Sequence, residues 1–190
     1  MFRESITKEE LAELPLVKFE GTITIVEYES QVDEIAKYLN KQKIIGFDTE
    51  TRPSFIKGNI NKVALLQLST HEHAFLFRLN KIGLPKSIVD ILKLKKIIKA
   101  GVAIRDDIKV LQNLSKFSPN GFIELQDQVQ EFGIQDFSLK KLSGIVLGCR
   151  ISKAQQLSNW EADLLTEAQQ VYAATDAWAA LKIYQNLFNN

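Results

Sequence analysis

Apolar and polar residues follow one another along this chain in short blocks, and the period of each block predicts its secondary structure. Residues 17–26 alternate with period two, as in a half-buried strand, whereas residues 30–39 carry apolar side chains at helical spacing. The apolar runs 44–48, 63–68 and 74–77 predict three more strands. The short polar turn between the last two runs predicts an antiparallel hairpin.

Helices alternate with strands in the second half of the chain. Strands first, and then strands alternating with helices, imply an α/β fold with a mixed sheet and helices on both faces. Ser138 and Thr166 are expected to open the last two helices. No repeat or linker divides the chain, so we expect one domain over residues 1–190, with 1–15 as an N-terminal arm or short surface helix. In order, the pattern predicts a helix over 86–92, a strand over 97–101, helices over 106–114 and 138–147, a polar loop over 148–160 and a long helix over 164–188.

Composition narrows the class of protein. The 190 residues are 45% hydrophobic and 25% charged, which is typical of one soluble globular domain. No apolar run approaches the roughly 20 residues of a membrane helix, and the N-terminus lacks the apolar centre of a signal peptide, so we expect a cytoplasmic protein without membrane contact. The net charge of +1 gives no global signal for nucleic acid. Four lysines can still form a local basic patch, or simply a solvated edge: Lys93, Lys95, Lys96 and Lys99.

Cysteine and histidine are too scarce for most zinc sites. Cys149 is the single cysteine, and His71 and His73 are the two histidines. A bound metal would therefore have oxygen ligands, which favours magnesium, manganese or calcium.

Two carboxylates stand at the end of the strand expected over 44–48. Asp48 and Glu50 are two residues apart, so on a strand their side chains point to the same face. Two like charges this close repel each other, and a divalent cation bound between them relieves the repulsion. A strand that runs into a solvated turn explains the pair at least as well, so the interpretation depends on whether other carboxylates meet them.

Two other segments offer such carboxylates. Tyr172 and Asp176 lie one helical turn apart on the same face, beside small alanines that let the helix approach a sheet. The alternative is an amphipathic helix with a half-buried tyrosine and a solvated aspartate.

Asp106 and Asp107 lie just beyond the strand expected over 97–101, where ligands gather in α/β sheets. One of them, with Asp106 preferred, can cap the next helix, which leaves the other without a structural reason.

Acidic groups on three separate elements meet the needs of a two-metal phosphodiesterase. In such sites, two cations about 3.5 to 4 Å apart hold the attacking water and the leaving oxygen on either side of the phosphorus. Carboxylates suit these hard cations, and neither a thiol nor an imidazole is required.

The acidic residues lie in three segments: Phe47-Asp48-Thr49-Glu50-Thr51, Lys99-Ala100-Gly101-Val102 through Asp107 and Leu111, and Tyr172-Ala173-Ala174-Thr175-Asp176-Ala177-Trp178. These segments are similar to the sequence motifs of a known nuclease family. Their order and spacing resemble the DEDD-type 3'-5' exonucleases, which have a ribonuclease H-like fold, and the tyrosine is typical of the DEDDy subgroup. The resemblance runs from about residue 20 to residue 188 and is strongest to the exonuclease domain of Werner syndrome helicases and stand-alone bacterial relatives. Outside the three motifs, it extends over Val63 to Ser69 and Ser158-Asn159-Trp160-Glu161.

This resemblance implies a role for each acidic residue. Asp48 would bridge two divalent cations, magnesium or manganese. Glu50 and Asp176 would complete the site of the metal on the side of the attacking water. Asp107, which the motif spacing favours over Asp106, would support the second metal through a water molecule.

The resemblance also places the substrate. Tyr172 has an ordinary pKa near 10, so it would orient the attacking water rather than remove its proton. The backbone around Thr49 and the side chain of Leu65 would contact the terminal sugar. Trp160 can stack on a base, although we prefer a structural role in which it holds the loop 148–161 against the closing helix. The candidate phosphate contacts are Lys57, Lys62, Arg105 and Lys153.

We therefore expect a metal-dependent 3'-5' exonuclease that releases nucleoside 5'-monophosphates from single-stranded or frayed 3' ends, with DNA favoured. Processing of RNA 3' ends, as by ribonuclease D, is an alternative, because DNA and RNA share the phosphodiester. A second rival is a catalytically inactive nucleic-acid-binding module, against which the intact acidic set argues. A third is an unrelated metal hydrolase with oxygen ligands.

Overall fold

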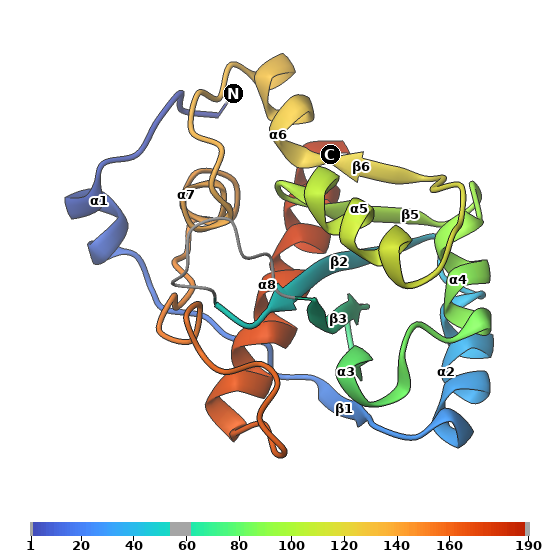
Figure 1. The fold of residues 1–190 in the computed structure, drawn as a ribbon. Coiled ribbons are helices and arrows are strands. Elements are labelled where there is room, and N and C mark those ends of the chain that lie inside the picture. Colours follow the sequence, from blue (N-terminus) through green and yellow to red (C-terminus); the bar gives the residue numbers. More distant parts are fainter. Residues whose placement is uncertain (1, 54–61, 189–190) are drawn as a thin grey trace.

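Six strands of the described chain form one mixed sheet (Figure 1). The structure is a computed structural model that describes residues 2–53 and 62–188. The strand order is β1-β4-β3-β2-β5-β6, and β3 runs antiparallel to both of its neighbours while the other pairs are parallel. This arrangement confirms the α/β class and the mixed sheet. The strands are β1 (Thr22–Val26), β2 (Ile44–Thr51), β3 (Val63–Ser69), β4 (His73–Arg78), β5 (Ile98–Gly101) and β6 (Phe122–Glu124).

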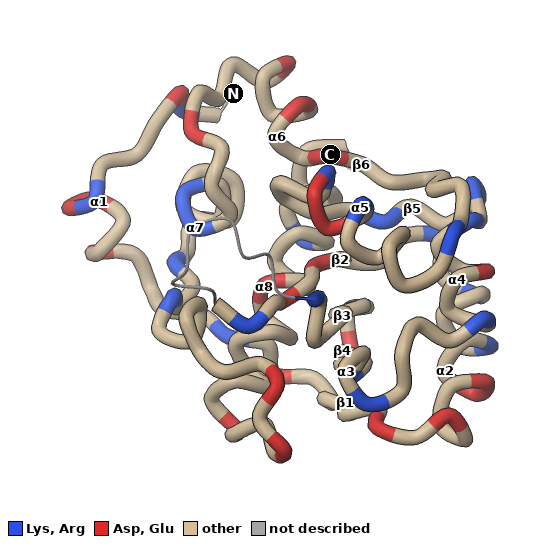
Figure 2. Tube along the Cα trace, viewed as in Figure 1, with Lys and Arg blue, Asp and Glu red and all other residues tan. Residues whose placement is uncertain are grey.

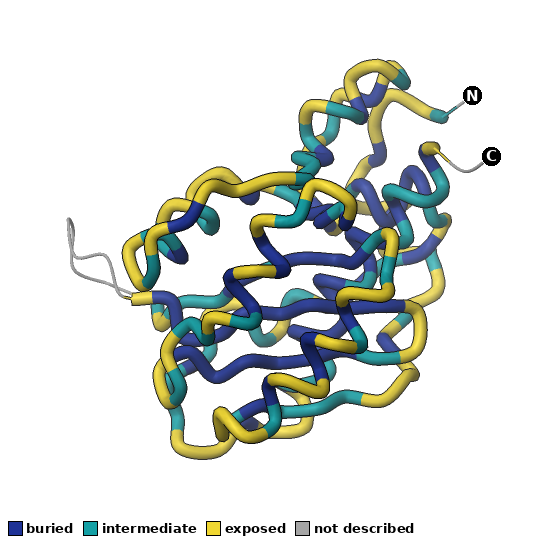
Figure 3. Tube along the Cα trace, turned by 90° about the vertical axis from the view of Figure 1, so that its right-hand side faces the viewer, coloured by how far each residue is buried: buried dark blue, intermediate teal, exposed yellow. Residues whose placement is uncertain are grey.

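Helices cover both faces of this sheet. On one face, α2, α4 and α5 bury their apolar sides against the strands, and on the other face α8 crosses the sheet, with α7 beside it and α1 beyond α7 (Figure 1). The central strands are buried along most of their length (Figure 3). The α-helices are α1 (Lys8–Glu13), α2 (Val32–Leu39), α3 (Leu79–Ile82), α4 (Lys86–Lys93), α5 (Ile104–Leu114), α6 (Leu125–Gln128), α7 (Leu139–Leu142) and α8 (Glu167–Phe188). Two 3-10 helices, η1 (Glu29–Gln31) and η2 (Val129–Phe132), and a π-helix, η3 (Ser143–Leu147), complete them.

The two expected helix-opening residues have this role in the structure. The Oγ of Ser138 accepts a hydrogen bond from the backbone N–H of Lys141 at 3.3 Å. The Oγ1 of Thr166 accepts one from the N–H of Gln169 at 3.2 Å. The antiparallel hairpin of β3 and β4 is also confirmed.

The strand expected over 17–26 is wrong in its first half, because β1 begins at Thr22. The preceding residues dock on other elements: the N–H of Val17 donates to the carbonyl of Arg150 at 2.9 Å, and the N–H of Phe19 donates to Thr175 Oγ1 at 3.0 Å. The sequence pattern does not predict β6, α3 or α6, each of which has only three or four residues, too few to show a period. Within the described residues, no helix is long and apolar enough to cross a membrane.

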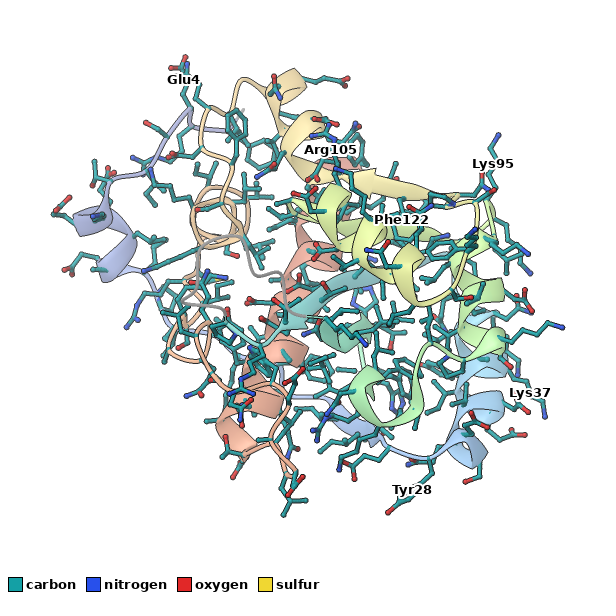
Figure 4. The ribbon with its side chains drawn as sticks, viewed as in Figure 1. Glu4, Tyr28, Lys37, Lys95, Arg105 and Phe122 are labelled. Carbon is teal, nitrogen blue, oxygen red and sulfur yellow. The ribbon has the colours of Figure 1, made fainter. Side chains whose placement is uncertain are left out.

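Lys99 corrects the expectation of a patch of four surface lysines. Its side chain is completely buried, and its Nζ donates to the carbonyls of Leu94 and Ile97 at 2.7 and 2.8 Å, just beyond the end of α4. Burial lowers the pKa of Lys99 to about 8. Figure 4 shows Lys95 projecting outward, by contrast, so the surface part of the patch has at most three lysines.

Helix α8 approaches β2 so closely that one position admits no side chain. A Cβ on Gly46 of β2 would lie 1.8 Å from the carbonyl oxygen of Ala177 in α8. Ala173, Ala174 and Ala177 are all completely buried on α8, so small residues form the contact on both sides. This contact fixes the distance between the helix and the strand.

Gly46→Ala tests this contact. We expect it to destabilise the protein by about 3 kcal/mol or more in urea unfolding, because the new methyl group overlaps a helix backbone that cannot yield without moving α8. Gly133→Ala is the control, since φ there is +76° but nothing lies within 4 Å of the added Cβ. That control should cost about 1–2 kcal/mol from backbone strain alone. An equal cost for the two variants would contradict the steric explanation.

Candidate functional site

The strand β2 presents alternate side chains to opposite faces of the sheet. Asp48 and Glu50 point toward α8, where their carboxylates meet that of Asp176, while the hydroxyl of Thr49 points toward α5. Both carboxylate residues are half-buried, and Thr49 is buried. The predicted pair therefore lies on a strand and not in a solvated turn.

Helix α8 supplies the third carboxylate of this cluster. One oxygen from each of Asp48, Glu50 and Asp176 lies within 4.8 Å of the others. Figure 2 shows these acidic positions of β2 and α8 next to each other where the two elements cross. Asp176 is only 3% exposed and Tyr172 only 5%, so the alternative of a solvated aspartate and a half-buried tyrosine is wrong. The close contact at Gly46 explains how a helix residue reaches the strand.

The crowded carboxylates shift one another's pKa values. Burial raises the pKa of Asp48 well above its ordinary value, and the charges of Asp176 and Asp107 add to this effect. Burial and the charge of Asp48 raise the pKa of Glu50 to about 9. Burial also raises the pKa of Asp176, although the ammonium of Lys153 counteracts the shift. Without a bound metal ion, Glu50 therefore retains its proton at neutral pH.

Lys153 is the positive charge that faces this cluster. Its Nζ donates to Asp176 Oδ2 at 3.0 Å and lies 3.5 Å from the hydroxyl oxygen of Tyr172. The same nitrogen lies 5.6 Å from the centre of the tyrosine ring. Lys153 comes from the loop between η3 and α8, so this loop closes one side of the site.

The residues fit a divalent cation. Three carboxylates within reach of a single point are the hard oxygen ligands that magnesium or manganese takes. Asp176 Oδ1 is buried and makes no hydrogen bond to any described residue, which leaves a buried acceptor that a cation can satisfy. Thiol and imidazole groups are absent from the cluster.

Asp107 stands apart from the three clustered carboxylates. It lies in the first turn of α5, where its Oδ1 accepts a hydrogen bond of 2.5 Å from Thr49 Oγ1. Asp107 lines the same cavity of about 410 Å³ as the other three acidic residues. Burial raises its pKa to about 6, while the Thr49 hydroxyl lowers it. Asp107 thus contributes a carboxylate to the cavity from α5, whereas Asp176 contributes one from α8.

Asp106 does not cap α5, contrary to expectation. The N-cap position is Ala103, and Asp106 points outward, where its carboxylate pairs with Lys109 at 2.8 Å. This hydrogen bond and charge lower the pKa of Asp106. Of the two neighbouring aspartates, only Asp107 lines the cavity.

Two residues expected to touch the substrate have no exposed surface in this structure. Leu65 and Trp160 are completely buried and pack in one cluster with Tyr172. The indole of Trp160 lies 5.9 Å from the Tyr172 ring, measured between centroids. Its loop is held by the buried Arg78, which donates to the carbonyls of Ala162 and Asp163. These contacts fit the structural role of Trp160, since a base cannot reach its ring.

The remaining candidates differ in their surroundings. Thr49 and Lys153 line the cavity. Arg105 is bound to Asp127 on the surface, with its Nη2 2.7 Å from Asp127 Oδ1. Lys62 is exposed, and Lys57 lies outside the described residues.

Two residues near the site have no signal in the sequence. Gln67 is the cross-strand partner of Asp48 and is completely buried, yet neither of its amide atoms hydrogen-bonds within the described part of the chain. Glu124, at the end of β6, binds the backbone at the start of α5. Both act through contacts between distant segments, which a local pattern does not predict.

The known proteins that this chain resembles in sequence carry exonuclease names. The model of a 3'-5' exonuclease family matches residues 23–190. The chain is 35% identical over 187 residues to the bifunctional 3'-5' exonuclease/ATP-dependent helicase WRN of Mus musculus, covering 93% of this chain and 13% of that protein. It is 34% identical over 160 residues to exonuclease 3'-5' domain-containing protein 2 of Drosophila melanogaster, covering 82% of this chain and 27% of the relative. The chain thus spans less than a third of either relative.

Solved structures agree on the fold. The EXO domain of Nibbler from Aedes aegypti superposes with a TM-score of 0.78 at 24% identity, over 90% of this chain and 88% of that one. Ribonuclease D of Escherichia coli gives a TM-score of 0.78 at 23% identity, over 88% of this chain and 44% of that one. These likenesses establish a ribonuclease H-like fold.

The raised pKa of Glu50 predicts how the stability of the metal-free protein depends on pH. The ordinary pKa of this carboxyl is 4.5 and its folded pKa is about 9, so the folded state holds the proton that the unfolded state releases. The stabilising contribution is complete below the ordinary pKa and is lost as the pH rises toward 9. Glu50→Gln cannot ionise, so we expect it to be more stable than the wild type at pH 8 in EDTA.

Thermal unfolding in EDTA at pH 5, 7 and 9 measures this effect. The melting temperature of Glu50→Gln should exceed that of the wild type by about 2–4 °C for each kcal/mol of repulsion removed, with the gap widening as the pH rises. Glu131→Gln, on the exposed surface, is the control for loss of one charge. A lower melting temperature for Glu50→Gln at pH 9 would contradict the repulsion.

Proposed function

The chain belongs to the family of 3'-5' exonuclease domains, and we propose that it is a metal-dependent enzyme that removes nucleotides one at a time from nucleic-acid 3' ends. Its products would be nucleoside 5'-monophosphates, its cofactors two magnesium or manganese ions, and its preferred substrate single-stranded or frayed DNA. The observation that carries the proposal is the meeting of Asp48, Glu50 and Asp176 within 4.8 Å, beside Tyr172. Tyr172 would place the chain in the DEDDy subgroup.

The acidic residues divide the work of holding the cations. Asp48 belongs to the cluster with Glu50 and Asp176 and lines the same cavity as Asp107. It would be shared by both metals, while Glu50 and Asp176 would complete one metal site and Asp107 would support the other through water. When bound, such cations acidify the attacking water and offset the charge of the phosphate oxygens. Binding of a cation would displace the proton that Glu50 retains, because a metal ligand must be deprotonated.

Tyr172 would orient the attacking water. Burial and the charges of Asp176 and Glu50 raise the pKa of its phenol above the ordinary value, so the hydroxyl remains protonated at neutral pH. A neutral hydroxyl can donate and accept hydrogen bonds but cannot serve as a base. The packing of Trp160 and Leu65 around the ring fixes the direction of this hydroxyl.

Lys153 would contact the scissile phosphate once cations satisfy Asp176. Its ammonium already lies within 3.5 Å of both Asp176 Oδ2 and the Tyr172 hydroxyl. Lysine commonly binds phosphate as a point charge. Thr49 lines the cavity from the opposite strand face, and its backbone would contact the terminal sugar.

The N-terminal arm would belong to one domain over 1–190. Its residues Ile6 and Leu11 are buried in one apolar cluster with residues of α7 and α8, which supports this proposal.

An RNA substrate is the alternative. The structural relatives include an RNase D of Trypanosoma brucei in complex with RNA and the Escherichia coli RNase D, described as an exoribonuclease involved in structured RNA processing. The sequence relative with the highest identity given above carries a helicase name. We favour DNA on that likeness, and direct comparison of the two substrates decides the matter.

Matched DNA and RNA oligonucleotides labelled at the 5' end test the proposed activity. With magnesium or manganese we expect a ladder of shortened products, faster with DNA, that disappears in EDTA and in Asp48→Ala. Asp107→Asn should slow the reaction, whereas the neighbouring Asp106→Asn, which loses only an exposed ion pair, should not. No ladder with either substrate, or a ladder that survives Asp48→Ala, would disprove the proposal.

Lys153→Met tests the phosphate contact. Loss of one phosphate contact should raise KM for an oligonucleotide about tenfold and reduce the salt dependence of log KM by about one charge. Lys140→Met removes an exposed lysine of α7 and serves as the matched control. An unchanged KM at 50 and 200 mM salt would show that Lys153 has no contact with phosphate.

A further inference from the structure

The start of α5 is a strained turn. Ala103, at the N-cap position, has φ 62° and ψ 33°, and it is the one non-glycine residue with positive φ among those described. This left-handed conformation costs an alanine roughly 1 kcal/mol relative to glycine. The turn is also tight, since a Cβ on Gly101 would lie 2.7 Å from the carbonyl oxygen of Phe47. Something must hold the backbone in this conformation.

Glu124 supplies the restraint from the edge strand β6. Its Oε1 accepts the N–H of Ala103 and its Oε2 the N–H of Ile104, both at 2.8 Å. The carboxylate therefore binds two successive free N–H groups at the N-terminus of an 11-residue helix, where a negative charge is favoured. Because Glu124 is the register partner of Gly101, the sheet itself sets its position.

The same helical turn carries Asp107. This residue lies three positions after Ile104, and its carboxylate accepts the 2.5 Å hydrogen bond from Thr49 on β2. The segment 103–107 is thus fixed at one end by β6 and at the other by β2. A shift or rotation of the first turn of α5 would move the Asp107 carboxylate directly, since a helix advances only about 1.5 Å per residue.

We propose that Glu124 is a positioning residue: its carboxylate clamps the strained turn at Ala103 and so fixes the place of Asp107 in the metal-binding cavity. This inference rests on the proposed function, in which Asp107 supports the second metal. Glu124 itself does not line the cavity. Capping by an ordinary N-cap side chain is not available here, because Ala103 has no polar side chain.

The test is a double-mutant cycle on oligonucleotide cleavage. Glu124→Gln replaces one acceptor oxygen with an NH2 group that cannot accept an N–H. We expect kcat to fall about 10- to 100-fold, as for other residues that orient metal ligands. In an Asp107→Asn background the same substitution should change kcat less than about twofold, since coupled positions are not additive. Equal losses in both backgrounds would overturn the proposal.

Two further variants separate positioning from stability. Asp127→Asn removes a carboxylate that also binds α5, through the exposed ion pair with Arg105, and should leave kcat unchanged. Ala103→Gly accepts positive φ without strain, so Ala103→Gly/Glu124→Gln should remain folded and recover part of the lost kcat. Failure of the glycine to recover any activity in a folded double variant would count against the clamp.

A readout without catalysis distinguishes this inference from the proposed function. Amide hydrogen exchange at Ala103 and Ile104 should accelerate in Glu124→Gln and not in Asp127→Asn, whether or not the protein cleaves nucleic acid. Unchanged exchange would disprove the clamp even in an active nuclease. If exchange confirms the clamp but the protein has no nuclease activity, the proposed function is disproved and the clamp stands. If Asp107→Asn is fully active, only the role of Glu124 in positioning Asp107 is overturned.

Discussion

The close contact between α8 and β2 is the constraint on which the candidate site depends. Gly46 and Ala177 bring a helix backbone against a strand backbone, and this is possible only because neither residue carries a larger side chain there. Asp176 is the residue next to Ala177, and Tyr172 lies one turn of helix before Asp176, so the contact places both beside the carboxylates of β2. Close packing of small residues between α8 and β2 therefore determines the geometry of a polar site.

The site gathers like charges at a cost to the fold. Burial raises the pKa of Asp48, Glu50 and Asp176, repulsion between the carboxylates raises those of Asp48 and Glu50 further, and the ammonium of Lys153 offsets part of this effect. A protein selected for stability alone would replace one of these carboxylates with an amide. Their retention is best explained by a ligand whose positive charge exceeds that of one ammonium group, which a divalent cation supplies.

The sequence was sufficient for the fold class and for the acidic cluster because both follow from local periods. Spacing of two on a strand and of four on a helix places Asp48, Glu50, Tyr172 and Asp176 correctly once the elements are known. The sequence was insufficient where contacts between distant segments determine the environment of a residue. Glu124 caps a helix that begins 20 residues earlier, so the local prediction of Asp106 as the cap was wrong. The burial of Trp160 likewise depends on Arg78, which is far away along the chain.

The alternation of β2 explains why its motif has a threonine between two carboxylates. Asp48 and Glu50 face α8, so the residue between them must face α5, where Asp107 is held. A hydroxyl at that position can donate to the Asp107 carboxylate, whereas valine, which has the same shape, would leave that oxygen without its partner in a half-buried place. One strand thus organises carboxylates on both of its faces, and the three consecutive residues act as a unit. The clamp at Ala103 contributes to the same arrangement. Thr49 can hydrogen-bond Asp107 only if the first turn of α5 holds the Asp107 carboxylate within reach of the hydroxyl.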